Sequence, residues 1–373
     1  RHLQRIHQGD KGTVFLSGTT ITNSLVETYN LLNYLRPRKL EELGMPTFDA
    51  WASTFAVHTS ELEATITGGF ALKDRFRQFD NVAELSQLYA EIADVRNDQN
   101  LKLPKPGIDA HTVIVPASDA MSEINSEIVN MIESKDGKYF GIYPKDPNRA
   151  PWGLHASTIS AKAAVSPRLI FPDMNDDGGK VHAVCENVKK YYDEMAEQRG
   201  VQLIFCEMGV PGKGKEYDAY TDMVNRFVND YGIPRSEIAY IQEAPTEEKR
   251  KDLFQRVRDG KVRILIGGTK NMGTGVNVQD RITDMHMLTV PWTPAALEQC
   301  IGRGGRQGNI VARDFMGNKV RVHYYATEGS LDLYKYQLLD AKGKMITQFK
   351  MGTVSGTRSF CLLYTSPSPR DRG

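Results

Sequence analysis

The regular alternation of helix and strand patterns in the second half of the chain most constrains its fold. Amphipathic helical patterns and short apolar strand patterns follow one another from residue 180 onward. In chain order, these segments are 180–199, 201–206, 216–231, 237–241, 246–258, 262–266, 285–290, 294–302, 319–326 and 331–350. Short apolar strands separated by helices form a parallel sheet that is covered on both faces. The sequence therefore predicts an α/β lobe over residues 176–350.

The first half of the chain is less regular. A short buried strand is expected at 13–19, and Thr22–Ser24 offers a cap for a helix that Pro37 closes. Proline and glycine then interrupt residues 36–110, which reads as an irregular helical insert. Three further elements are expected after it: a strand at 112–115 and helices at about 118–133 and 154–166.

Composition limits the class of protein. No run of about 18 apolar residues occurs, so we expect no transmembrane helix and no membrane partner. The formal net charge is +1, so any nucleic-acid binding must come from a local surface. The four cysteines form no CxxC pair, which favours reduced thiols in the cytoplasm over a zinc site or disulfides: Cys185, Cys206, Cys300 and Cys361.

Both ends of the chain look artificial. The chain starts at Arg1 without an initiator methionine or a signal peptide, so we expect a truncated N-terminus. Residues 361–373 resemble the translation of a sequencing adapter, and we expect them to be a scar. The alternative is a genuine disordered tail rich in proline and serine.

Two arginines three residues apart carry the most informative chemistry. Gln299 stands near the end of helix 294–302, and the glycines that follow predict a tight turn from which Arg303 and Arg306 project. A planar guanidinium binds phosphate oxygens through two hydrogen bonds and stabilises charge on a phosphoryl group in transfer. Taken alone, the segment fits a solvated loop or a flexible RNA-binding segment more readily. The dinucleotide-binding fingerprint fails, because Gln307 stands at its third glycine position.

A second polar loop, Lys270–Gln279, directly follows the strand expected at 262–266. Ligands bind at the carboxyl ends of parallel strands in open α/β sheets. The loop offers hydrogen-bonding groups on Thr274, Asn277 and Gln279. A plain turn between strand and helix explains this loop equally well when it is taken alone.

Together, the two segments resemble the conserved motifs of superfamily 2 helicases. Motif VI is matched by Gln299-x-x-Gly302-Arg303-x-x-Arg306, and motif V, as Swi/Snf-like members have it, by Gly273–Gln279. Weaker matches precede them in the correct order: Ile204–Glu207 is similar to motif IV and Leu16–Thr19 to motif III. The chain is thereby identified as a relative of this superfamily.

Two further segments point to a particular group of proteins within this superfamily. Phe48–Phe55 and Pro291–Pro294 resemble the large helicase-like proteins of phages and mobile elements. Some of those proteins carry an adenine methyltransferase and are linked to protection from restriction. The similarity covers about residues 10–358. Thr20 departs from a common proline, and Cys300 stands where arginine is common, which puts a phosphate or DNA contact in doubt.

The resemblance implies two RecA-like lobes with ATP bound between them. Residues 1–35 would be a remnant of the first lobe, 36–175 a helical insert, and 176–350 the second lobe. The phosphate-binding loop, the DEAx box and the Mg²⁺ ligands are expected before Arg1, in the missing N-terminal lobe. This chain alone would then be inactive.

The resemblance also implies roles for individual residues. Arg303 and Arg306 would be catalytic, at the γ-phosphate of ATP. Residues expected to bind the nucleotide are Gln299, Gly302, Gly273 and Gly275. Residues expected to couple hydrolysis to nucleic-acid binding are Ser17, Gly18, Thr19, Thr269, Lys270, Thr274, Asn277 and Gln279. The expected partner is double-stranded DNA, in the cytoplasm of a bacterium or in a phage particle.

Two segments imitate the missing ATP motifs. Gly209–Lys215 matches GxxxxGK after a strand, but Glu216 replaces the Ser or Thr that would hold Mg²⁺. Asp193–Ala196 resembles a DEAx box but lies in the middle of a polar helix. Four other residues are expected to serve structure: Trp51 and Trp292 as core or turn anchors, and His286 and His323 on strands.

The leading hypothesis is therefore an ATP-dependent DNA helicase or translocase, present here as a fragment. The alternative is a non-catalytic protein that binds or protects DNA, as a phage or mobile element could encode. The motifs do not decide between unwinding and translocation.

Overall fold

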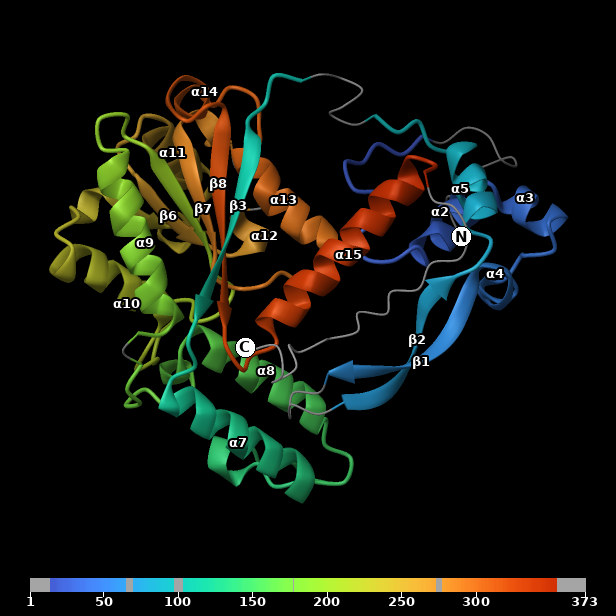
Figure 1. Ribbon diagram of the computed structural model, residues 1–373, viewed down its shortest axis with the longest axis horizontal. Coiled ribbons are helices and arrows are strands. Elements are labelled where there is room, and N and C mark those ends of the chain that lie inside the picture. Colours follow the sequence, from blue (N-terminus) through green and yellow to red (C-terminus); the bar gives the residue numbers. More distant parts are fainter. Residues whose placement is uncertain (1–13, 65–69, 97–102, 177, 273–276, 354–373) are drawn as a thin grey trace, which may run out of the picture.

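A six-stranded, fully parallel sheet forms the centre of the structure, a computed structural model that describes residues 14–64, 70–96, 103–176, 178–272 and 277–353. The strand order is β3-β8-β7-β4-β6-β5, and every ladder is parallel (Figure 1). The strands are β3 (Gly107–Val115), β4 (Val201–Phe205), β5 (Ile238–Tyr240), β6 (Ile264–Gly267), β7 (Ile282–Met287) and β8 (Lys319–Thr327). The predicted α/β lobe with a parallel sheet is confirmed.

Helices cover both faces of this sheet and enclose two hydrophobic cores. One core packs α9 (Lys180–Glu194) and α10 (Ala219–Asn225) against the sheet, and a π-helical turn, Arg226–Asp230, continues α10. The opposite core is covered by α11 (Glu247–Arg258), α12 (Thr269–Met272), α13 (Pro294–Gly304) and α14 (Ile310–Phe315). Strands such as β4 and β6 are buried along their whole length, as strands covered on both faces must be.

A smaller helical unit packs against the last helix of the lobe, α15 (Asp332–Lys350) (Figure 1). It contains α2 (Glu27–Leu35), α3 (Pro37–Glu42), α4 (Phe48–Phe55) and α5 (Val82–Ala90), with the antiparallel hairpin β1 (Ala56–Ala64) and β2 (Phe70–Phe79). Phe349 of α15 is buried in its core, and the Ser86 hydroxyl donates a hydrogen bond to the Phe349 carbonyl at 2.9 Å. A separate pair, α7 (Asp119–Ser134) and α8 (Trp152–Val165), has its own apolar core and matches the expected helices.

Two expectations for the first half are wrong in detail. Residues 14–19 form no strand, and Val14 and Leu16 are exposed, because no strand of the described residues lies beside them to complete a ladder. The segment 36–175 is not simply helical, since it contains a hairpin and the edge strand β3 of the main sheet. The strand expected at 112–115 is confirmed as the end of β3, which pairs with β8 from Gly107 onward. The division at residue 176 remains a prediction, and residues 361–373 lie outside the described residues.

The start of α2 also differs from the expected cap. The helix begins at Glu27, and no side chain caps it. Instead, the Glu27 carboxylate accepts hydrogen bonds from the backbone N–H groups of Thr22, Asn23 and Ser24 at 2.7–3.2 Å. The Thr22 carbonyl in turn accepts from Ala295 N at 3.3 Å, which ties this loop to the first turn of α13.

Among the described residues, no helix is both long and apolar enough to cross a bilayer.

A buried polar network crosses the middle strands of the sheet. Asp284 of β7 is fully buried and accepts hydrogen bonds from Arg321 at 2.7 and 3.0 Å and from His323 at 3.0 Å. His286 lies between the Gln202 amide and the Tyr325 hydroxyl, at 2.9 Å from each. Its ring stacks on that of His323, with centroids 4.8 Å apart. Both histidines serve the sheet, as expected.

This network predicts that His286 makes a contribution to the stability of the lobe that falls as the pH falls below 6.5. Burial, followed by the nearby His323, lowers the pKa of His286 from 6.5 to about 3. Below pH 6.5 the unfolded chain binds a proton that the folded chain does not, so stability falls as the pH falls. The slope from this residue approaches about 1.4 kcal/mol per pH unit. Urea unfolding between pH 7 and pH 5 measures it.

A His286→Gln variant provides the control, because glutamine can bond to both neighbours but does not titrate. Its stability should depend less on pH across this window. Hydrogen bonds from His323 and Arg321 hold the pKa of Asp284 below its ordinary value despite its burial, so Asp284 titrates below the window. Equal slopes for the variant and the natural chain would contradict this account.

Candidate functional site

The two motif-like segments lie on the same face of the sheet. Met272, at the end of α12, belongs to the same apolar core as Cys300 of α13, and so does Val278 after the loop. The described parts of the Thr269–Asn277 loop and of the arginine turn, Gly302–Arg306, therefore share one face of the sheet. Gly273, Thr274 and Gly275 lie outside the described residues.

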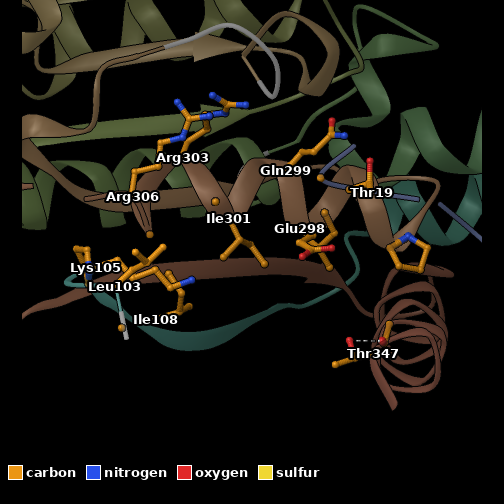
Figure 2. A pocket seen from close by; sticks show the side chains of 18 of the residues that line it. Thr19, Leu103, Lys105, Ile108, Glu298, Gln299, Ile301, Arg303, Arg306 and Thr347 are labelled. Carbon is orange, nitrogen blue, oxygen red and sulfur yellow. Dashed lines mark hydrogen bonds between the residues drawn. The ribbon is translucent and has the colours of Figure 1, made fainter. Parts of the chain in front are cut away.

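A groove of about 1430 Å³ runs along α13. One wall is the segment that enters β3, with Leu103, Lys105 and Ile108, and the other wall is α15. Figure 2 shows Arg303 and Arg306 toward one end of the helix, and Gln299 beside Thr19 toward the other. The groove brings together these predicted site residues: Gly18, Thr19, Gln279, Gln299, Gly302, Arg303 and Arg306.

The remaining described candidates lie outside the groove lining. The Ser17 hydroxyl accepts a hydrogen bond from Thr19 N at 3.1 Å. The backbone N–H of Thr269 donates to the Glu207 carboxylate, and the Asn277 carbonyl accepts from Arg258 at 2.6 Å. Lys270 is on α12 and exposed. These residues are held close to the site but do not line it.

The two arginines differ in exposure. Arg303 is only 7% exposed, whereas Arg306 is open to solvent. Burial, followed by the positive charge of Arg306, lowers the pKa of Arg303 below its usual value. A guanidinium group stays charged even so. Two repelling cations at one end of a groove favour an anion that binds both, and phosphate oxygens match guanidinium geometry.

The arginine turn lies close against the sheet because Gly304 has no side chain. A Cβ atom on Gly304 would stand 2.8 Å from Met285 Cε and 3.0 Å from Val320 Cγ1. The neighbouring Gly302 faces open space. A side chain at position 304 would therefore press on β7 and β8, whereas one at position 302 would not.

Alanine at these two positions should have opposite effects on stability. We expect Gly304→Ala to destabilise the lobe by about 1–3 kcal/mol, since overpacking forces α13 or its neighbours to shift. Gly302→Ala should be neutral or stabilising by up to about 1 kcal/mol, because alanine favours a helix over glycine. Urea unfolding followed by circular dichroism compares the two variants. Equal effects would mean that the turn does not press on the sheet.

Cys300 does not affect the groove in the way its departure from the family pattern suggested. Its side chain is fully buried in the core, and burial raises the pKa of its thiol to about 12. The thiol is hydrogen-bonded to the Thr269 side chain. This position therefore packs α13 onto α12 and faces away from solvent.

The two imitations of ATP motifs have other structural roles. Lys215 donates a hydrogen bond to the Val210 carbonyl at 2.6 Å, within its own loop, and helix α10 begins later, at Ala219. In a phosphate-binding loop the helix follows the lysine directly. Asp193 is exposed and paired with Lys189 at 2.7 Å, as expected for a solvated helix face.

Of the two expected roles, core or turn anchor, Trp51 takes the core role, whereas Trp292 lies in a loop. Trp51 is fully buried among aromatic rings of the helical unit. Trp292 is 71% exposed in the loop between β7 and α13, so a core role is wrong for it. Its neighbour Pro291 is buried, and the Lys335 ammonium lies 5.3 Å from the Trp292 ring centroid.

Sequence reasoning missed the groove wall and one anchor. The groove wall is part of the site only because β3 pairs with β8, and it consists of Leu103, Lys105 and Ile108. No local sequence pattern indicates this pairing. Glu207 was noted only as part of a motif IV match, although it bonds to the start of α12. A carboxylate directly after a buried strand could have indicated it.

Comparisons with known proteins agree with the motifs. Residues 1–97 match a family described as "Probable helicase domain", and residues 179–308 match "Helicase conserved C-terminal domain". Among solved structures, the C-terminal part of the Fun30 ATPase domain aligns at a TM-score of 0.41 and 15% identity, over 65% of this chain and 98% of that one. The Sulfolobus solfataricus SWI2/SNF2 ATPase C-terminal domain aligns at 0.44 and 15%, over 66% and 94%.

Two curated relatives are much longer than this chain. Defense against restriction protein B of Escherichia phage P1 is 40% identical over 90 residues, which is 24% of this chain and 4% of that protein. The SNF2 domain-containing protein CLASSY 3 of Arabidopsis thaliana is 21% identical over 309 residues, 79% of this chain and 20% of that protein. The chain therefore matches the helicase conserved C-terminal domain at residues 179–308, and parts of it are similar to a phage protein and to an SNF2 domain-containing protein.

Proposed function

We propose that the chain is part of an ATP-dependent DNA helicase or translocase and supplies the arginine side of its nucleotide site. The observation that carries this proposal is the pairing of buried Arg303 with exposed Arg306 at one end of the groove along α13. Arg306 would contact the γ-phosphate as an arginine finger. The buried Arg303 would add a second positive charge beside it.

The nucleotide itself would be held mainly by another lobe. Guanidinium groups fit the phosphates of ATP, and Gln299 and Gly302 line the same groove. Mg²⁺ should accompany the nucleotide. In the part of the chain that the structure describes, no cluster of three or more metal-binding side chains is found. As the resemblance to superfamily 2 helicases implies, the Mg²⁺ ligands and the phosphate-binding loop would lie on that other lobe.

Nucleic acid would bind beside the nucleotide site. The Thr269–Asn277 loop starts at the carboxyl end of β6. The exposed Trp292 lies in the loop that follows β7, the next strand along the chain. An exposed aromatic ring near Lys335 is a typical element of a nucleic-acid surface. We propose double-stranded DNA as the partner, in a bacterial cytoplasm or a phage particle.

A non-catalytic role in binding or protecting DNA is the second candidate. The 90-residue match to Defense against restriction protein B favours it, because that name describes protection. The two candidates differ in turnover, because only a motor needs to hydrolyse ATP continuously.

Steady-state ATP hydrolysis by a longer version of the protein, including the sequence upstream of Arg1, separates them. The motor proposal predicts hydrolysis that duplex DNA stimulates. Tight DNA binding without hydrolysis would support the protective role and overturn the motor. RNA in place of DNA tests the choice of partner.

A further inference from the structure

Glu207 lies where three neighbouring strands of the sheet end. It follows β4 after Cys206, and its backbone N–H donates a hydrogen bond to the Thr289 hydroxyl, just beyond β7, at 3.0 Å. Its carboxylate accepts a hydrogen bond from the backbone N–H of Thr269, which opens α12 after β6. Glu207 thus connects the ends of β4, β6 and β7, through its backbone N–H to Thr289 and its half-buried side chain to Thr269.

The corner between β6 and α12 is built closely around this carboxylate. A Cβ atom on Gly268 would stand 2.8 Å from the second carboxylate oxygen of Glu207, so glycine is needed for the approach. The backbone supports the same arrangement, because Cys206 N donates to the Gly267 carbonyl at 3.0 Å. The carboxylate therefore occupies a defined place beside the first turn of α12.

Helix α12 depends on such an anchor. It spans only four residues, Thr269–Met272, and a single helical turn is unstable by itself. A carboxylate that accepts from a helix N-terminus makes a charge-assisted hydrogen bond and complements the helix dipole. The other end of the turn is fixed by buried Met272, and the Thr269 side chain also contacts the Cys300 thiol of α13.

We propose that Glu207 is a positioning residue that holds the start of the Thr269–Asn277 loop against α13, the helix that carries Gln299 and Arg303. The role of Glu207 in positioning α12 is independent of the proposed function, whereas the effect of Glu207 on nucleic-acid binding rests on that function. Without the carboxylate, α12 keeps its apolar contacts and the contact between Thr269 and Cys300, but it loses the hydrogen bond at its first backbone N–H. Residues 269–272 then sample several positions relative to α13.

Hydrogen exchange measured by mass spectrometry on the 373-residue chain tests the geometric part. Glu207→Ala should speed exchange of the amides at 268–272 by about ten- to hundredfold, since a hydrogen bond to a charged group is lost. Amides in β4 and β6 should keep their rates. Glu207→Gln should retain most of the protection, because its amide oxygen still accepts from Thr269 N.

Two further variants make the result specific. Thr289→Val removes only the bond to the Glu207 backbone, and exchange at 268–272 should stay unchanged. Glu207→Asp withdraws the carboxylate by one methylene and should speed exchange relative to Glu207→Gln. If Glu207→Ala does not fold, the comparison of Asp with Gln decides. Equal exchange at 268–272 in the folded variants would overturn the proposal.

Binding of a fluorescein-labelled DNA duplex, followed by anisotropy, tests the functional part. The natural chain and Glu207→Gln should bind alike, and Glu207→Ala about tenfold or more weakly, as loss of one charge-assisted contact implies. If the natural chain does not bind DNA, the proposed function fails, while the exchange rates still decide the positioning role. Normal binding by a Glu207→Ala variant with fast exchange would separate Glu207 from the nucleic-acid surface and overturn this part.

Discussion

Replacing Arg306 by alanine in the longer protein should lower ATP turnover by about 10³- to 10⁵-fold, as loss of an arginine finger does. The physical reason is that its guanidinium group would neutralise charge that develops on the phosphoryl group in transfer. Arg306 is exposed at the end of α13, so its removal should leave the fold intact. DNA affinity should remain within a few-fold of the natural value, because the loop and Trp292 are untouched.

Two further variants sharpen this result. Arg306→Lys should restore little activity, since a point charge lacks the planar fork of guanidinium. Lys344→Ala provides the control, because Lys344 is an exposed cation on the opposite wall of the same groove. Its turnover should stay close to the natural value. Unchanged turnover in Arg306→Ala would remove the arginine-finger assignment.

The second large effect concerns stability. Lys180 at the start of α9 is 1% exposed, and its ammonium lies 2.5 Å from the Asp332 carboxylate at the start of α15. Lys180 also donates to the Leu288 carbonyl at 3.2 Å, beyond the end of β7. Asp332→Ala would leave a buried, uncompensated ammonium, which typically costs about 3–5 kcal/mol. Urea unfolding at neutral pH measures the loss.

An exposed pair on the same helix gives the matched control. Lys344 and Asp340 form an ion pair at 2.7 Å with both side chains largely in solvent. Asp340→Ala should therefore cost less than about 1 kcal/mol. Replacing both buried partners, as Lys180→Met with Asp332→Leu, should cost less than Asp332→Ala alone. Equal losses for Asp332→Ala and Asp340→Ala would show that burial does not matter at this pair.

The lobe was predictable because local sequence patterns identify its strands and helices. Strands such as 201–205 and 264–267 are apolar runs that both sheet faces bury completely. Helix 294–304 carries its own cap at Thr293 and a proline in its first turn. Local propensity and hydrophobic pattern agree in these segments, so the parallel sheet followed from the residues alone.

The remaining features depend on contacts between distant segments. Strand β3 joins the sheet through β8, about two hundred residues later in the chain, which local propensity does not reveal. The strand expected at 13–19 is absent over residues 14–19, since a strand needs a neighbour as well as an apolar sequence. At the site, the motif located Arg303, Arg306 and Gln299, but the groove wall depends on the placement of β3.

Steady-state ATP hydrolysis by the 373-residue chain alone, with and without DNA, tests the central claim most directly. The claim is that this chain supplies arginines to a nucleotide site whose phosphate-binding loop lies elsewhere. We expect no DNA-stimulated hydrolysis by the chain alone and clear stimulation once the upstream lobe is joined to it. Robust hydrolysis by the chain alone would contradict the account, because Gly209–Lys215 would then have to act as a phosphate-binding loop.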